Sequence, residues 1–228
     1  MPIKVCVFDA YGTLFDVGAA ARIAAAEQGR DALAAKSGEL AEFWRQKQLS
    51  YSWLRAVSGN HIDFWTVTEN ALDWALERTG LDDDMELRER LLALYWELAA
   101  YREVPMMLAT VKAGGLQTAI LSNGSPEMLE GAVESACIET YLDAVLSVQD
   151  VGVFKPDPKV YQMVLDHFNC TADEVLFVSS NGWDAAAASG FGFQTAWVNR
   201  AGEPMDRLFA EPQHVLSDLT EIPELAGL

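Results

Sequence analysis

Cysteine, histidine and positive charge are all scarce in this chain of 228 residues. The three cysteines are odd in number and form no Cys-x-x-Cys pair, so we expect reduced thiols in a cytoplasmic protein. The three histidines are scattered, which argues against a histidine-bound metal. Lysine and arginine number 16 against 34 aspartates and glutamates, and the net charge is −18. Because nucleic-acid phosphates bind to clustered Lys and Arg, this balance excludes a nucleic-acid partner.

Long hydrophobic runs are missing as well. No stretch approaches the roughly 20 apolar residues of a membrane span, and the acidic balance disfavours binding to an anionic membrane. The start, Met-Pro-Ile-Lys, leads into an apolar run that Asp9 interrupts, so we expect no signal peptide. Apolar residues nevertheless make up 50% of the chain, which suffices for a substantial core. The length fits one large domain or a core with a smaller insert.

Strand patterns occur in only part of the chain. One apolar, partly β-branched run ends at Asp9, where Gly12 lets the chain turn, and the strand pattern then disappears until about residue 116. In between, apolar residues recur at helical spacing near 38–57, 62–78 and 85–100. Five of the seven tryptophans fall in this part, which is typical of helix packing and is also compatible with an apolar substrate slot.

From about residue 116 strands and helices alternate. We expect strands at 117–121, 144–148, 174–179 and 194–198, an edge strand at 214–216, and helices at 126–137, 158–168 and 183–189. Repeated strand–helix units imply a mainly parallel sheet with helices on both faces. We therefore predict an α/β fold with a Rossmann-like core at 1–16 and 102–228. The helical segment 17–101 would be a cap domain inserted after the first strand.

Four polar segments follow strands or lie in loops of this core: Asp9 with Thr13, Ser122-Asn123-Gly124-Ser125, Lys155 before Pro156, and Ser179 to Asp184. The carboxyl ends of parallel strands border one crevice, so we expect the four segments to converge. Each has an ordinary alternative when taken alone. Ser-Asn-Gly-Ser followed by proline is also a common turn and helix start, and a lysine before proline is commonly exposed.

The order of these segments resembles the four-motif layout of the haloacid dehalogenase superfamily. Phosphatases of that superfamily carry a second aspartate two residues after the first, and a further acid in the last motif. Tyr11 and Ser179 stand at those positions here. Mg²⁺ requires hard oxygen ligands and is usually held by carboxylates beside a phosphate. We therefore expect neither a metal ion nor another cofactor.

Longer strings closely resemble the L-2-haloacid dehalogenase family. They are Phe-Asp-Ala-Tyr-Gly-Thr-Leu-Phe-Asp (8–16), Trp-Arg-Gln-Lys-Gln-Leu (44–49), Leu-Ser-Asn-Gly-Ser (121–125), Lys-Pro-Asp (155–157) and Phe-Val-Ser-Ser-Asn-Gly-Trp-Asp (177–184). The resemblance implies hydrolytic dehalogenation of short (S)-2-haloalkanoic acids to (R)-2-hydroxy acids and halide. It also implies a homodimer, with the haloacid and the halide as small-molecule partners.

The residue types fit that reaction. An ionised Asp9 can attack the carbon that bears the halogen and form an ester, which water then hydrolyses at the Asp9 carbonyl. Lys155 would keep Asp9 ionised and would itself be neutralised by Asp184. The resemblance implies that this group is hydrogen-bonded, and that the water is placed, by Thr13, Ser179 and Asn181.

The remaining residues would bind the substrate. By resemblance, Ser122 and the backbone N–H groups after it hold the carboxylate, while Arg45 and Asn123 receive the halide. Arg45 and Leu49 are i,i+4 neighbours on a helix and can share a face, on which the guanidinium would stabilise developing negative charge. The resemblance also assigns to the substrate pocket Tyr11, Gln46, Leu49, Phe64, Trp183 and Tyr161, the last supporting Lys155. For Tyr161, an ordinary packed helix tyrosine stays an open alternative.

Two other functions remain to be weighed. One is a Mg²⁺-dependent phosphatase of the same fold, which Tyr11 and Ser179 disfavour. The other is a catalytically silent relative that binds an acid metabolite or a protein partner, which the intact set of polar segments disfavours.

Overall fold

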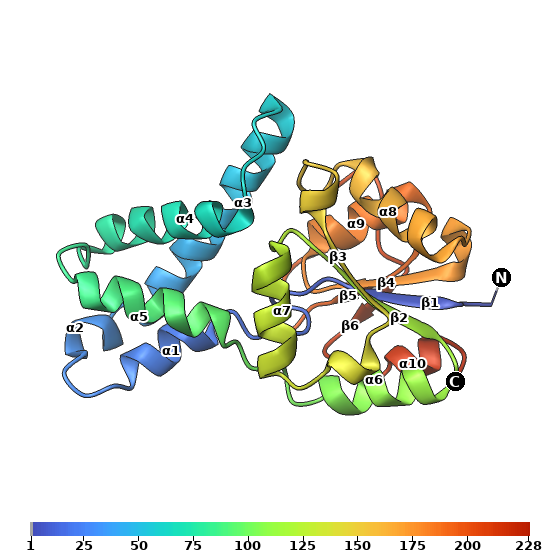
Figure 1. Ribbon diagram of the computed structural model, residues 1–228, viewed down its shortest axis with the longest axis horizontal. Helices are drawn as coiled ribbons and strands as arrows, with labels where there is room; N and C mark the ends of the chain where they lie inside the picture. Colours follow the sequence, from blue (N-terminus) through green and yellow to red (C-terminus); the bar gives the residue numbers. More distant parts are fainter. Residues whose placement is uncertain (1) are drawn as a thin grey trace.

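A parallel sheet flanked by helices forms one part of the computed structural model, which describes residues 2–228 (Figure 1). The sheet formed by these residues has six strands in the order β3-β2-β1-β4-β5-β6, and all neighbouring strands are parallel. The strands are β1 (Val5–Phe8), β2 (Gln117–Ser122), β3 (Ala144–Ser147), β4 (Val175–Ser179), β5 (Gln194–Val198) and β6 (His214–Leu216). The predicted α/β class with a Rossmann-like parallel sheet is confirmed.

The centre of the sheet fixes where the polar segments emerge. Every residue of β1 is buried, as expected for a strand covered on both faces. Phe8 lies in register with Ile120 of β2 and with Val178 of β4. The segments that follow these three strands therefore leave the sheet side by side at one edge, where the strand order changes direction.

Helices cover both faces of the sheet. They are α6 (Val104–Ala113), α7 (Pro126–Ser135), α8 (Pro158–Phe168), α9 (Gly182–Phe191) and α10 (Ile222–Leu225), with short 3₁₀ turns η1 (Glu139–Tyr141), η2 (Val148–Asp150) and η3 (Ala172–Glu174). Figure 1 shows α6 and α10 on one face and α8 and α9 on the other. Helix α6 has no counterpart among the sequence-based expectations, because its nearly continuous apolar run shows little helical periodicity.

The other five helices, which we call the helical unit, lie beyond the carboxyl ends of the strands (Figure 1). They are α1 (Ala19–Ala25), α2 (Asp31–Ala34), α3 (Ser37–Ser58), α4 (Phe64–Thr79) and α5 (Met85–Trp96). The three long ones match the expected helical stretches, except that α5 ends four residues earlier than predicted. The Asp63 side chain caps α4, and glycines with positive φ end α3 and α4.

The chain crosses between the sheet and the helical unit through two adjacent segments. Asp16 N donates to Ala99 O at 3.0 Å, and Tyr101 N donates to Leu14 O at 2.9 Å. Phe15 forms an antiparallel bridge with Ala100. The outgoing and returning segments are therefore hydrogen-bonded to each other a few residues from Asp9. The division into a core and a cap at 17–101 agrees with this layout and stays a prediction.

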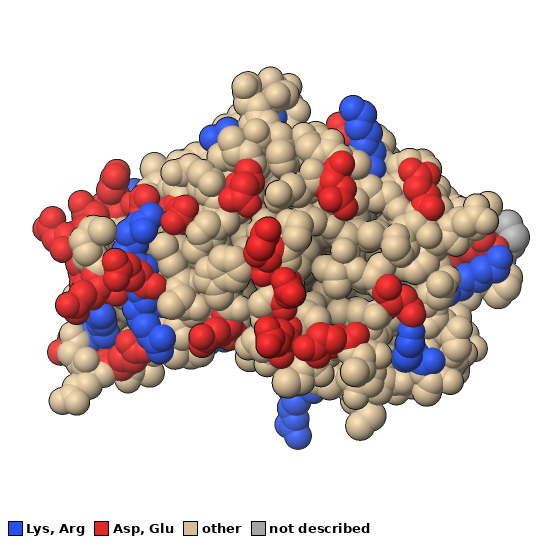
Figure 2. Space-filling model, in the orientation of Figure 1, with Lys and Arg blue, Asp and Glu red and all other residues tan. Residues whose placement is uncertain are grey.

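Among the charged side chains on the face seen in Figure 2, acidic ones predominate, and many of them gather at the outer end of the helical unit. This agrees with the net charge of −18. In the part of the chain that the structure describes, no helix is both long enough and apolar enough to span a bilayer.

Candidate active site

Asp9 lies directly after β1, and its carboxylate is held by four side chains. Lys155 Nζ donates to Oδ1 at 3.0 Å. Thr13 Oγ1 and Asn181 Nδ2 each donate to Oδ2 at 3.0 Å, and Ser179 Oγ lies 3.5 Å from the same oxygen. These partners come from three of the predicted polar segments, so the segments converge. The carboxylate is fixed in orientation and faces a buried cation.

Lys155 lies between two carboxylates. Its Nζ is 3.0 Å from Asp9 Oδ1 and 2.8 Å from Asp184 Oδ2, and its side chain is 1% exposed. Burial alone would lower the pKa of Lys155, but the charges of Asp184 and Asp9 outweigh burial, and the pKa lies above its ordinary value. Lys155 is therefore a permanent cation, and the exposed alternative is wrong. Asn123 holds the segment by accepting from Lys155 N at 3.0 Å.

Asp184 lies in the first turn of α9 and is fully buried. Burial raises its pKa, and the Lys155 ammonium opposes that rise. Tyr161 on α8 donates its hydroxyl to Asp184 Oδ1 at 2.8 Å. Burial holds the pKa of Tyr161 well above its ordinary value, so this hydroxyl stays a donor. The structure does not bring Tyr161 to the cavity lining: its hydroxyl binds Asp184, the partner of Lys155, and its ring packs among Phe177 and Phe193.

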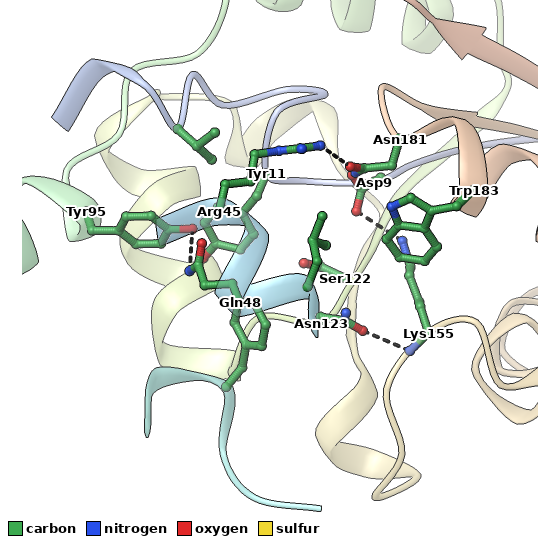
Figure 3. A pocket seen from close by; sticks show the side chains of 13 residues that line it. Asp9, Tyr11, Arg45, Gln48, Tyr95, Ser122, Asn123, Lys155, Asn181 and Trp183 are labelled. Atoms are coloured by element: carbon green, nitrogen blue, oxygen red, sulfur yellow. Dashed lines mark hydrogen bonds and ion pairs between the residues drawn. The ribbon is translucent and has the colours of Figure 1, made fainter. Parts of the chain in front are cut away.

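A cavity of about 50 Å³ opens in front of Asp9, between the sheet and the helical unit (Figure 3). The predicted residues that line it are Asp9, Tyr11, Arg45, Leu49, Phe64, Ser122, Asn123, Lys155, Asn181 and Trp183. Val17, Gln48 and Tyr95 line it as well and were not predicted. Thr13, Ser179 and Asp184 lie behind this lining and bind the residues that form it.

Tyr11 forms a large part of the apolar wall. Its ring stacks on Tyr95, with centroids 5.5 Å apart, and lies 6.3 Å from the ring of Phe64. A Cβ at Gly124 would come within 2.8 Å of the Tyr11 ring, so a side chain there would displace it. Burial raises the pKa of Tyr11 well above its ordinary value, and the phenol is therefore neutral. Tyr11 shapes the cavity without adding charge to it.

The segment after β2 serves two purposes. Ser125 caps α7 by accepting from Met128 N, as the ordinary turn interpretation expects. Ser122 and Asn123 of the same turn line the cavity, and Gly124 N donates to Ser122 Oγ at 3.1 Å. The turn interpretation is therefore confirmed at Ser125, while a role for Ser122 and Asn123 in binding an anion stays a prediction.

Arg45 brings a cation from the helical unit to the sheet. It projects from α3, and its Nη2 donates to Asn181 Oδ1 at 2.5 Å. Since Asn181 also binds Asp9, the guanidinium lies close to the carboxylate without pairing with it directly. Arg45 is thus not the exposed helix arginine that its sequence position alone suggests.

The structure does not bring Gln46 to the cavity lining, where it was predicted to form part of the pocket wall. It is exposed, and its Nε2 donates to Glu42 Oε1 at 2.7 Å. Gln48 lines the cavity instead. Residues three and four places after Arg45 share its side of the helix, whereas the next residue is turned by roughly 100°. The i,i+3 spacing of Arg45 and Gln48 was the available signal, whereas no sequence signal placed Tyr95 of α5 here.

The donor set does not fit Mg²⁺. Within residues 2–228, no group of three or more His, Cys, Asp or Glu side chains is arranged to hold a metal ion. Asp9 and Asp184 are the two carboxylates of the site, and the Lys155 ammonium lies between them. A divalent ion there would have to displace a buried lysine.

Comparison with known proteins assigns the family. Residues 3–192 match the family model of haloacid dehalogenase-like hydrolases. The chain is 46% identical over 224 residues to (S)-2-haloacid dehalogenase 1 of Pseudomonas sp. (strain CBS-3), covering 98% of this chain and 96% of that protein. The chain belongs to the L-2-haloacid dehalogenase family. It is therefore an enzyme of the haloacid dehalogenase superfamily of hydrolases.

Other members of the L-2-haloacid dehalogenase family extend the comparison. (S)-2-Haloacid dehalogenase 4A of Burkholderia cepacia is 42% identical over 220 residues, covering 96% of this chain and 93% of that protein. The structure of the L-2-haloacid dehalogenase from Xanthobacter autotrophicus with chloropropionic acid covalently bound matches with a TM-score of 0.87. It is 38% identical in sequence and covers 98% of each chain. The similarity thus extends over the sheet and the helical unit alike.

Proposed function

We propose that this dehalogenase converts short (S)-2-haloalkanoic acids and water to (R)-2-hydroxy acids and halide, through an ester on Asp9 and without a metal ion. The observation that carries the proposal is the Asp9 carboxylate itself, which lines a small cavity, is paired with the buried Lys155 cation and lies near Arg45. The names of the relatives and the covalently bound chloropropionic acid in one of them support it.

The first step forms the ester. An oxygen of Asp9 attacks C2 of the acid from the side opposite the halogen, and the carbon–halogen bond breaks as the new carbon–oxygen bond forms. The halide leaves with the bonding electron pair. Arg45 and Asn123, both in the cavity lining, supply donors for the charge that builds on it. Rear attack inverts the configuration at C2.

The second step hydrolyses the ester and regenerates the Asp9 carboxylate. Water adds to the carboxyl carbon of Asp9, and the bond from that carbon to the ester oxygen on C2 breaks. The 2-hydroxy acid leaves with that oxygen and with a proton from water. The remaining proton goes to solvent. Thr13, Ser179 and Asn181 orient the Asp9 group for this attack. Because C2 is not touched again, the inversion of the first step persists in the product.

The substrate is held from both sides of the cavity. Ser122 and the backbone N–H groups after it bind the carboxylate at the end of β2. Leu49 and Phe64 from the helical unit, with Tyr11 and Trp183 from the sheet side, enclose the carbon chain. The helical segment 17–101 thus acts as the cap of a core formed by 1–16 and 102–228.

We further propose that the enzyme is a homodimer in the cytoplasm, with no nucleic acid or membrane partner. The dimer is tested by gel filtration combined with light scattering. A mass near the 25.0 kDa of one chain would contradict it.

The decisive test of the reaction is a single turnover in ¹⁸O-water. The label is expected in the Asp9 side chain, located by mass spectrometry of the peptide that contains it. Label in the hydroxy acid alone would mean that water attacked C2 directly, and would overturn the ester mechanism. Asp9→Asn is the control, since its amide cannot form the ester.

Substrate class is tested by halide release from both enantiomers of 2-chloro- and 2-bromopropionate. Release from the (S) enantiomers, with (R)-lactate as product, is expected. No halide from any short haloacid would favour a catalytically silent relative. Activity toward phosphate esters that requires Mg²⁺ would favour the phosphatase.

A further inference from the structure

Gln48 and Tyr95 form the wall of the reaction cavity that lies away from the Lys155–Asp9 pair. Figure 3 shows them on the opposite side of the cavity from Lys155 and Trp183, joined by a hydrogen bond. Gln48 is 6% exposed and lies on the same helix as Arg45. Its amide is hydrogen-bonded to side chains of α4 and α5. This wall belongs to the helical unit, so it can differ without any change in the groups around Asp9.

The wall is held rigidly. Gln48 Nε2 donates to Tyr95 OH at 3.1 Å and to Thr68 Oγ1 at 3.0 Å, and all three side chains are buried. Burial raises the pKa of Tyr95 to about 12, so its hydroxyl stays neutral. The Tyr95 ring packs between those of Tyr11 and Trp44, at 5.5 and 5.0 Å. Moving Gln48 aside would break two buried hydrogen bonds, which is costly.

A second cavity, of about 180 Å³ and partly open to solvent, lies on the other side of this wall, lined by α3, Tyr95 of α5 and the segment before α1. It shares Val17, Arg45, Gln48 and Tyr95 with the reaction cavity, whose volume is about 50 Å³. The rest of its lining is small or apolar at Gly18, Gly38, Ala41 and Trp44, with the exposed Glu42 as the one charged addition. The smaller space that contains the nucleophile is thus separated by side chains from a larger space suited to an alkyl chain.

We propose that Gln48 sets the longest 2-haloalkanoate that the enzyme accepts, and that the second cavity receives the alkyl chain of longer acids when residue 48 is small. The inference rests on the proposed function and adds a specificity-determining residue to it. A two- or three-carbon acid fits in front of the wall. Each further methylene meets the Gln48 amide, which its two hydrogen bonds prevent from turning away.

The test compares kcat/KM for (S)-2-bromohexanoate and (S)-2-bromopropionate in Gln48→Ala, Gln48→Leu and the parent enzyme. Gln48→Ala is expected to raise the hexanoate-to-propionate ratio on the order of tenfold or more, the range that a pocket shows for one or a few methylenes. Gln48→Leu keeps the bulk but loses both hydrogen bonds that hold the side chain, so its ratio is expected to lie between those of the parent and Gln48→Ala. Gln46→Ala, two residues away but pointing out of the cavity, is the matched control and should leave the ratio unchanged.

The outcomes separate the two claims. If the parent releases no bromide from either acid, the proposed function fails and the inference fails with it. If the parent is active but the ratio is unchanged in Gln48→Ala, or rises equally in Gln46→Ala, the inference alone is overturned. Should Gln48→Ala not fold, as judged by circular dichroism, Gln48→Ser decides the question. Serine is nearly as small as alanine and keeps a hydroxyl beside Tyr95 and Thr68, so the same rise is expected there and an unchanged ratio overturns the inference.

Discussion

Lys155 and Asp184 form a buried ion pair, with Nζ and Oδ2 2.8 Å apart and side chains 1% and 0% exposed. The pair joins the loop after β3 to the first turn of α9, and Asp9 shares the same ammonium. Such a pair gains strength from the low dielectric of its surroundings, but each charge is costly if left alone. The Lys155–Asp184 pair therefore contributes to the fold and at the same time fixes the cation that faces Asp9.

Removing the cation should destabilise the protein. Lys155→Met leaves Asp9 and Asp184 facing each other without a positive charge, and the free energy of unfolding is expected to fall by about 3–5 kcal/mol. Urea unfolding measures it. Arg22→Met, which breaks the more exposed Arg22–Asp16 pair, with side chains 60% and 27% exposed, is the control and should change the midpoint little. Equal losses in both variants would contradict a special role for the buried pair.

The pH dependence of the reaction should report Asp184. Its pKa is raised by burial above the ordinary 3.8, so it takes up a proton earlier than a free aspartate as the pH falls. Protonation removes one of the two charges that balance Lys155. The acid limb of kcat/KM should therefore lie above pH 3.8.

Tyr161→Phe should move that acid limb further up. The Tyr161 hydroxyl lowers the pKa of Asp184 by donating to its carboxylate, so its removal raises the pKa. The plateau at higher pH should change less than the limb, since Tyr161 does not line the cavity. Tyr141→Phe, away from the cavity, should leave the pH profile as it is. An unshifted limb in Tyr161→Phe would show that another group controls it.

Arg45→Lys should slow the loss of halide. Lysine keeps the charge but not the planar set of donors, and loss of one such donor to a developing anion costs about 10²-fold in kcat. The fall in kcat should be larger for a 2-chloro acid than for a 2-bromo acid, since bromide is the better leaving group. Stopped-flow measurement of halide release checks this. Arg55→Lys on the same helix is the control, since Arg55 does not line the cavity.

Gly124→Ala should damage the cavity without altering any polar group. The new methyl would lie 2.8 Å from the Tyr11 ring and 3.1 Å from Leu129, and such overpacking costs about 1–3 kcal/mol. Both the thermal midpoint and kcat/KM are expected to fall. Gly38→Ala, where no atom lies within 4 Å of the new methyl, should lower neither.

Chelation should not inhibit the enzyme. We expect the rate of halide release to be the same in EDTA and in added Mg²⁺, because Lys155 occupies the position between the two carboxylates. Loss of activity in EDTA that Mg²⁺ restores would contradict the proposal.

The sheet side of the site was predictable because strands end where polar residues begin. Asp9, Ser122 and Ser179 each follow or end an apolar strand, and parallel pairing brings strand ends together. The helical side was less predictable. A helix turns by about 100° per residue, so an error of two positions exchanges an exposed glutamine for a buried one, as between Gln46 and Gln48.

Some features carry no local signal. Tyr95 reaches the cavity because α5 packs within the helical unit, and no spacing within α5 reveals that contact. Helix α1 is rich in alanine and has little apolar periodicity to detect. Tyr161 is fixed by a partner on another helix, Asp184, which the strand-and-loop pattern alone does not identify.

The hydrogen-bonded crossing at residues 14–16 and 99–101 lets the two halves of the active site evolve separately. Asp9, Lys155 and Asn181 line the cavity from the sheet side, whereas Gln48, Leu49 and Tyr95 line it from the helices between the two crossing segments. Because the outgoing and returning segments are bonded to each other, the helices between them can lengthen, shift or be exchanged without moving Asp9. New specificities can thus arise through changes in the helices, provided that Arg45 keeps its place beside Asn181.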